Sequence, residues 1–160
     1  MADQPPASPP LPKECAVFEK DVGTWDAVIR VFGTPGEIVN ETRGVAMNRL
    51  IASGRWLVMN FRADSGFEGH GIYGFDPARG KYVGTWVDTM RTSLAQLEGT
   101  WDPEKRTMTF LGEMKTPDGR TVRWREETQH TDDRTQVYRS IVLLPDGKEH
   151  VALEVTYRRR

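Results

Sequence analysis

Turn signals recur at short intervals along most of this chain, and they constrain its fold more than any other feature. From Trp25 onward, clusters of Gly, Pro, Asp and Ser interrupt segments rich in Val, Ile, Thr and aromatic residues. Such clusters mark turns because these residues supply positive φ, a preset φ or a local side-chain cap. The predicted turns are Gly33-Thr34-Pro35-Gly36, Ser53-Gly54, Ser65-Gly66, Asp76-Pro77-Ala78-Arg79-Gly80, Met90-Arg91, Asp102-Pro103-Glu104, Pro117-Asp118-Gly119, Thr131-Asp132-Asp133 and Pro145-Asp146-Gly147. Nine turns therefore separate ten predicted strands.

Several of these segments alternate apolar and polar side chains with a period of two. One face is shared by Trp25, Ala27, Ile29 and Val31 in the first segment, by Leu57, Met59, Phe61 and Ala63 in the third, by Met108, Phe110 and Met114 in the seventh, by Val122 and Trp124 in the eighth, and by Val151, Leu153, Val155 and Tyr157 in the last. Successive side chains of a strand point to opposite faces, so one face is buried and the other solvated. This pattern is typical of antiparallel sheet.

Ten strands joined by tight turns form a meander, and an open meander would expose two long edges. Closure into a barrel removes these edges, and it requires the first strand, near Trp25, to pair with the last, near Leu153. Residues 13–22 show a helical apolar spacing that Gly23 ends. The predicted fold is all-β: an antiparallel up-and-down barrel of about ten strands with a short N-terminal helix, large enough to leave interior space.

The 160 residues are enough for one domain, which we expect to span residues 13–160. Residues 1–12 hold five of the ten prolines and predict an extended, disordered arm. A PxxP-type ligand for a partner domain is an alternative role for this arm. The arm lacks the basic and apolar regions of a secretory signal, which together with a single cysteine predicts a cytoplasmic protein.

The charge balance and the metal-ligating residues exclude several classes of partner. Lys and Arg number 22 against 23 Asp and Glu, so the chain has no basic footprint for nucleic acid or an anionic membrane. The lone Cys15 excludes an internal disulfide and a cysteine-based zinc site. The histidines, at 70, 130 and 150, show no metal-binding spacing, so no metal is expected. Self-association as a homodimer stays open.

Trp86 and Asp88 are two residues apart, so they share one face of the fifth predicted strand with Tyr82 and Gly84. If that face points inward, an aromatic wall and a carboxylate line the cavity. A carboxylate in such surroundings could anchor a ligand or act as a general acid or base. The alternative is that Asp88 caps the turn at Met90-Arg91 while the opposite face is buried.

Four further residues complete the candidate site. His70 lies between Gly69 and Gly71, and glycines in a strand allow a ligand or another backbone to approach closely. Tyr73 would add aromatic contact area. Glu126 shares a face with Trp124 and could point inward beside Asp88. For Glu154 the alternation predicts the outer face.

A resemblance to a known family rests on motifs in the second half of the chain. Phe75-Asp76-Pro77, Tyr82-Val83-Gly84-Thr85-Trp86-Val87-Asp88-Thr89-Met90 and Glu98-Gly99-Thr100-Trp101-Asp102 resemble the bacterial family called domain of unknown function 1579, as does the ending Asp146-Gly147-Lys148-Glu149 with Glu154-Val155-Thr156-Tyr157-Arg158-Arg159. Gly23-Thr24-Trp25 is similar to the Gly-x-Trp start of lipocalin-like barrels. The resemblance implies a lipocalin-like (calycin) barrel without an established activity.

A more distant resemblance is to nitrobindin, which shares the Gly-x-Trp start and a ten-stranded barrel. That family binds haem through a histidine on its last strand. Aligned on Thr156-Tyr157, the ligand position falls near Glu154, inside the barrel, whereas His150 comes too early. Because glutamate is a poor haem ligand, the expected cofactor is none.

The sequence therefore predicts a cytoplasmic barrel that binds a small hydrophobic or amphipathic molecule in its cavity. The ligand-binding candidates are Tyr73, Trp86, Asp88, His70, Glu126 and Glu154. A second hypothesis is a cofactor-independent lyase, isomerase or hydratase that uses Asp88 or His70 as its catalytic acid or base. A third is a haem protein that uses His150, and a fourth is an interaction module recruited through the arm.

Overall fold

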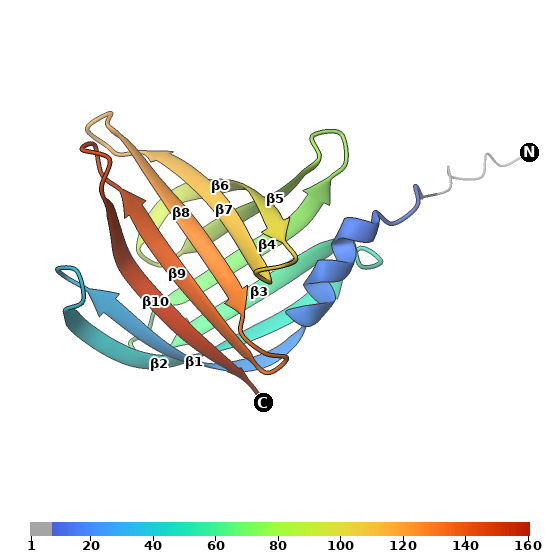
Figure 1. Ribbon diagram of the computed structural model, residues 1–160, viewed down its shortest axis with the longest axis horizontal. Helices are drawn as coiled ribbons and strands as arrows, with labels where there is room; N and C mark the ends of the chain where they lie inside the picture. Colours follow the sequence, from blue (N-terminus) through green and yellow to red (C-terminus); the bar gives the residue numbers. More distant parts are fainter. Residues whose placement is uncertain (1–7) are drawn as a thin grey trace, which may run out of the picture.

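A computed structural model describes residues 8–160, which form a closed barrel of ten antiparallel strands preceded by one short helix (Figure 1). The elements are the 3₁₀ helix η1 (Lys13–Lys20) and the strands β1 (Gly23–Phe32), β2 (Ile38–Ile51), β3 (Trp56–Ala63), β4 (Glu68–Asp76), β5 (Lys81–Asp88), β6 (Arg91–Asp102), β7 (Thr107–Lys115), β8 (Thr121–His130), β9 (Thr135–Leu143) and β10 (Glu149–Arg159). Residues 1–7 of the predicted arm lie outside the described residues. Among the described residues, no helix has the length and apolar character needed to cross a membrane.

The strands pair in chain order, and the first strand pairs with the last. β1 and β10 run antiparallel from Trp25 opposite Arg159 to Val31 opposite Leu153. This pairing joins the two edges that a ten-stranded meander would otherwise expose. The predicted fold class, with its closure between the first and last strands, is confirmed.

One face of each strand points into the barrel, as the alternation of apolar residues predicts. On β1, Trp25, Ala27 and Ile29 are buried, and Asp26 between them is exposed. The aligned positions of the other strands continue this inner face because facing residues of an antiparallel pair point to the same side.

The last strand departs from the predicted alternation at one position. The register between β9 and β10 shifts between Val151, which pairs with Ile141, and Leu153, which pairs with Ser140. A β-bulge at this place adds one residue to β10, so Val151 and Leu153 do not share a face. The expectation that all four apolar residues of this strand face inward is therefore wrong for Val151.

Helix η1 lies against one end of the barrel (Figure 1). Its buried residues Cys15 and Phe18 pack with Leu57 and Tyr82, and the Tyr82 hydroxyl donates to the carbonyl of Glu14 at 3.1 Å. The helix ends at Lys20, two residues before the predicted limit, and the N–H of the C-cap residue Asp21 donates to the carbonyl of Phe18 at 3.0 Å. We call this end the closed end and the opposite end the open end.

Trp25 fixes the closed end from within. Its indole N–H donates to the Asp21 carbonyl at 2.9 Å, and the Arg159 guanidinium lies 4.2 Å from the centroid of its ring. Arg159 also donates to the carbonyls of Lys20 and Val22. The last strand thus holds both the first strand and the end of the helix.

Candidate functional site

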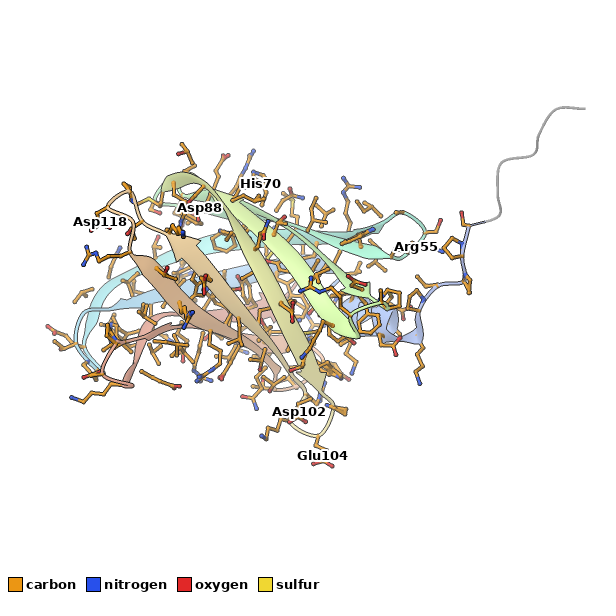
Figure 2. All side chains as sticks on the ribbon, turned by 90° about the horizontal axis from the view of Figure 1, so that it is seen from above. Arg55, His70, Asp88, Asp102, Glu104 and Asp118 are labelled. Atoms are coloured by element: carbon orange, nitrogen blue, oxygen red, sulfur yellow. The ribbon has the colours of Figure 1, made fainter. Side chains whose placement is uncertain are left out.

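On β5, Trp86 and Asp88 lie on the inner face, in register with Gly71 and Gly69 of β4. Asp88 is near the open end (Figure 2). The Trp86 indole N–H donates to Oδ2 of Asp88 at 3.0 Å, and the Met90 backbone N–H donates to Oδ1 at 2.8 Å. Nε of Arg91 lies 3.5 Å from Oδ2, and only 3% of the Asp88 side chain is exposed. Asp88 therefore both faces the interior and caps the β5–β6 turn, and its two oxygens are occupied by partners within the chain.

The same arrangement recurs on β8. Trp124 and Glu126 lie on the inner face, and the indole N–H donates to Oε1 of the carboxylate at 2.8 Å. In both strands an indole thus binds the acid two residues further along. The repeated Trp-x-acid spacing is visible in the sequence once both strands are placed, because a period of two brings both side chains to one face.

Each of these two indoles lies on a glycine of the preceding strand. A Cβ atom added at Gly69 of β4 would collide with the ring of Trp86, and one added at Gly112 of β7 would collide with the ring of Trp124. The glycines thus allow the rings to lie along the barrel wall. The flanking glycines of His70 predict the close approach of a ligand or another backbone, and at Gly69 the group that approaches is the ring of Trp86.

Glu126 is a buried acid that influences the pKa values of several inward tyrosines. Burial raises the pKa of Glu126, and the hydrogen bonds from Trp124 and Tyr138 and the charge of Arg91 lower it by less. Burial, followed by the charge of Glu126, also raises the pKa of Tyr138 well above its ordinary value. The carboxylate and the phenols thus share one desolvated region.

Tyr73 and Tyr157 belong to the same region. Burial, and after it the charge of Glu126, raises the pKa of both phenols. Tyr73 comes from β4 and Tyr157 from β10, so strands far apart in the chain contribute to one surface. Tyr138, Tyr157 and Arg91 were not among the site residues predicted from the sequence. The period of two could have placed each tyrosine on an inner face, but only the closed register brings them to Glu126.

Several inward side chains between the middle of the barrel and its open end are only partly buried. In a closed barrel, an inward side chain stays accessible to solvent where it borders interior space or the open end. The inward side chains that are half-buried include Met59, Tyr73, Trp86, Met114, Glu126, Tyr138, Ser140 and Leu153. They come from seven strands, and several of them, such as Tyr73, Trp86 and Met59, pack against the buried core.

Two of the six candidate ligand-binding residues face away from the interior. His70 is exposed on the outer surface, where Nδ1 lies 2.9 Å from Oδ1 of Asn60 on β3 (Figure 2). Glu154 also lies on the outer face and forms ion pairs with Arg139 at 3.0 Å and Arg30 at 3.7 Å. The inner position that nitrobindin implies for Glu154 is therefore not what the structure shows. Tyr73, Trp86, Asp88 and Glu126 are the candidates that face the interior.

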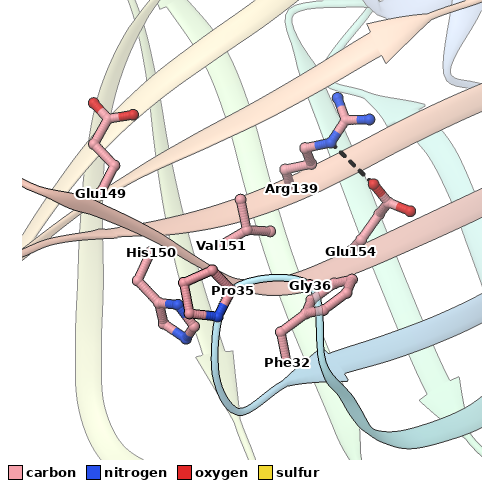
Figure 3. A pocket seen from close by; sticks show the side chains of 8 residues that line it. All are labelled: Phe32, Pro35, Gly36, Arg139, Glu149, His150, Val151 and Glu154. Atoms are coloured by element: carbon pink, nitrogen blue, oxygen red, sulfur yellow. Dashed lines mark hydrogen bonds and ion pairs between the residues drawn. The ribbon is translucent and has the colours of Figure 1, made fainter.

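Two pockets have defined volumes, and neither is lined by the four inward candidates Tyr73, Trp86, Asp88 and Glu126. One, of about 280 Å³, lies where β10 extends beyond the end of its pairing with β1. Figure 3 shows His150 beside Pro35 of the β1–β2 loop, on the opposite side of β10 from Glu149 and Val151. The other, of about 570 Å³, crosses β6, β7 and β8, and ion pairs such as Arg123–Glu113, at 2.8 Å, border it.

The arrangement limits the chemistry that these residues can perform. The enzyme hypothesis depends on Asp88 or His70, but Asp88 is held by the indole, the turn and Arg91, and His70 is outside. His150, the residue of the haem hypothesis, is aligned with Val142 of β9 and lies beside Pro35 of the β1–β2 loop (Figure 3). The described residues contain no group of three or more His, Cys, Asp or Glu side chains that could hold a metal ion. Glu126 lies among the inward phenols of Tyr73, Tyr138 and Tyr157.

Comparisons with known proteins identify a family and name no activity. A family model described as "Protein of unknown function (DUF1579)" matches residues 12–159. No curated protein matches the chain. One similar solved structure is a protein of unknown function from the DUF3598 family of Nostoc punctiforme PCC 73102, with 8% sequence identity and a TM-score of 0.32 over 94% of this chain and 100% of that one. This likeness is too weak to support a conclusion.

Proposed function

We propose that this chain, which belongs to the DUF1579 family, binds a small, partly apolar molecule inside its barrel. The observation that carries the proposal is the set of inward side chains, Glu126 among them, that stay partly exposed on seven strands of the closed barrel. A protein interior is normally packed to the density of an organic crystal, so side chains that border open interior space are the usual lining of a ligand site. Aromatic area with a few polar groups is typical of such sites.

The four inward candidates have different roles in the proposed binding. Trp86 and Tyr73 supply apolar contact area along the wall. Glu126 is the polar group available to a guest, since Asp88 already binds the indole and the turn. Asp88 is therefore a positioning residue for Trp86 in this proposal. For location, the free and buried Cys15 suits a reducing compartment, and we propose the cytoplasm.

A neutral apolar fluorophore tests the proposal directly. N-phenyl-1-naphthylamine should bind to the full chain, and its emission should rise on excitation of the interior indoles. Ser140→Leu fills part of the interior and should weaken this signal at least about tenfold, since an apolar side chain would occupy the space of the guest. Thr109→Leu on the outer face of β7 is the matched control and should leave the signal unchanged.

Native mass spectrometry of protein purified from its own host provides an independent readout. A co-purified small molecule that is lost in the Ser140→Leu variant supports the proposal. If the fluorophore binds equally well to both variants, or binds to neither the wild type nor the control, interior binding is wrong.

A further inference from the structure

The charges that face the interior are unbalanced. Toward the open end, Asp88 has Arg91 as its ion-pair partner at 3.5 Å. Glu126, in the middle of the barrel, accepts a hydrogen bond from the neutral indole of Trp124, and it forms no ion pair with any residue that the structure describes. Arg91 acts on Glu126 only through its charge at a distance. The middle of the barrel thus holds one acid without a cation.

Aromatic rings surround this acid on several strands. Phe110 of β7 is its partner across the ladder, and the ring centroids of Phe110 and Tyr73 are 5.5 Å apart. Tyr138 and Tyr157 complete the group from β9 and β10. The faces of aromatic rings carry negative electrostatic potential and attract organic cations. Carboxylate and rings therefore favour the same kind of guest.

We propose that the interior selects a small organic cation: a protonated amine that carries an apolar body. The ammonium group would pair with Glu126, and the body would lie against the rings. This inference rests on the proposed function, because it names the class of ligand for the same site. An anionic guest would face an uncompensated carboxylate in a region of low dielectric, which disfavours it. A bare metal ion lacks enough ligands among the residues described here.

Binding of such a cation is coupled to the proton of Glu126. Burial makes the empty barrel favour the protonated acid, whereas an ammonium group at the same place favours the carboxylate. The other groups that face Glu126 are the phenols of Tyr73, Tyr138 and Tyr157, which burial keeps neutral, and Arg91, which stays charged. Amine affinity should therefore rise with pH as Glu126 ionises, and fall once the amine itself loses its proton.

Three probes that share a phenylbutyl body and differ in the charge of their polar group separate the contribution of charge to affinity from that of apolar burial. Isothermal titration calorimetry compares 4-phenylbutylamine, 4-phenylbutanol and 4-phenylbutyrate on the full chain at neutral pH. We expect the amine to bind at least about tenfold more tightly than the alcohol, as a charge-assisted contact implies, and the carboxylate to bind most weakly. Glu126→Gln should reduce the amine to the affinity of the alcohol and leave the alcohol unchanged. Glu127→Gln, on the outer face of the same strand, is the matched control.

The outcomes distinguish this inference from the function on which it rests. If the alcohol binds as tightly as the amine, or if Glu126→Gln affects both equally, selection for a cation is wrong while interior binding stands. If none of the three probes binds, interior binding itself is overturned. Titration of the wild type in two buffers of different ionisation enthalpy needs no variant: release of a proton on amine binding supports the inference, and its absence below neutral pH contradicts it.

Discussion

At the scale of single residues, the interior depends on contacts between indoles and glycines. Trp86 lies on Gly69, and Trp124 lies on Gly112, so each ring follows the wall instead of crossing the interior. A methyl group at either glycine would push its indole inward. The shape of the interior is thus set as much by two missing side chains as by the rings that line it.

Gly69→Ala should destabilise the protein by about 1–3 kcal/mol, the usual cost of overpacking, because the new methyl group collides with Trp86. Equilibrium unfolding in urea measures the change. In a double-mutant cycle, the smaller ring of Trp86→Phe should absorb most of the cost. If the two substitutions are simply additive, the indole does not rest on this glycine.

The buried acid makes a prediction about stability and pH. The folded state raises the pKa of Glu126 above its ordinary 4.5. Ionisation of Glu126 therefore lowers the free energy of unfolding as pH rises above 4.5, and the loss is complete above the raised pKa. Glu126→Gln should therefore raise Tm at neutral pH, and the gain should vanish toward pH 4. Thermal unfolding of both proteins across this range measures it; a gain that is constant with pH would contradict the raised pKa.

The sequence predicts part of this site and not the rest, for a physical reason. The period of two along β5 and β8 places Trp86, Asp88 and Glu126 on inner faces, since all three are fixed by neighbours in their own strands. That Tyr138 and Tyr157 meet Glu126 depends on the register between strands, which is a long-range property. His70 shows the reverse case: its flanking glycines suggested a site, but the register places it outside.

At the scale of elements, charges of alternating sign form a row across the outer face. In register, the row runs from Glu41 through Arg30 and Glu154 to Arg139, with ion pairs between neighbours at 2.9, 3.7 and 3.0 Å. Each pair joins two adjacent strands, among them β1 and β10. The ion pair between Arg30 and Glu154 therefore supports the pairing of β1 with β10 from the outer side of the barrel.

Glu154→Gln removes the centre of this row and should cost no more than about 1 kcal/mol, since partly exposed ion pairs contribute little. Urea unfolding should show this loss at low salt and a smaller one at high salt because salt screens exposed charges. Binding of the fluorophore should be unchanged. Loss of binding in this variant would place Glu154 in the site after all.

The bulge in β10 marks the limit of prediction from alternation at this scale. An apolar pattern fixes which residues share a face only while the ladder is regular. One extra residue near Ala152 reverses the sense of the pattern, and no residue type in the segment marks it.

At the scale of the whole molecule, the closed end joins helix, first strand and last strand through Arg159. Arg159→Ala should destabilise the protein by about 2 kcal/mol, because it removes the cation over Trp25 and leaves the carbonyls of Lys20 and Val22 without their donor. Thermal unfolding measures the loss. The neighbouring Arg158 is exposed on the opposite face, and Arg158→Ala should cost far less. Equal effects would show that the closed end does not depend on this contact.

The overall architecture was predictable because it rests on local signals. Turns and alternation specify ten strands, and the cost of two open edges leaves closure as the solution. The packing of the interior is less local, because it depends on how far side chains from different strands extend toward one another.

All strand pairings but one join neighbours in the chain, and the exception is the pairing of β1 with β10. A chain whose synthesis has not yet reached Glu149 therefore has nine strands and no partner for either outer edge. Its hairpins can form as they are made, but the ring cannot close until the last strand is available. A stalled or truncated product would expose two strand edges with unpaired backbone N–H and C=O groups. Such edges pair with other chains, so this topology makes incomplete chains prone to aggregation.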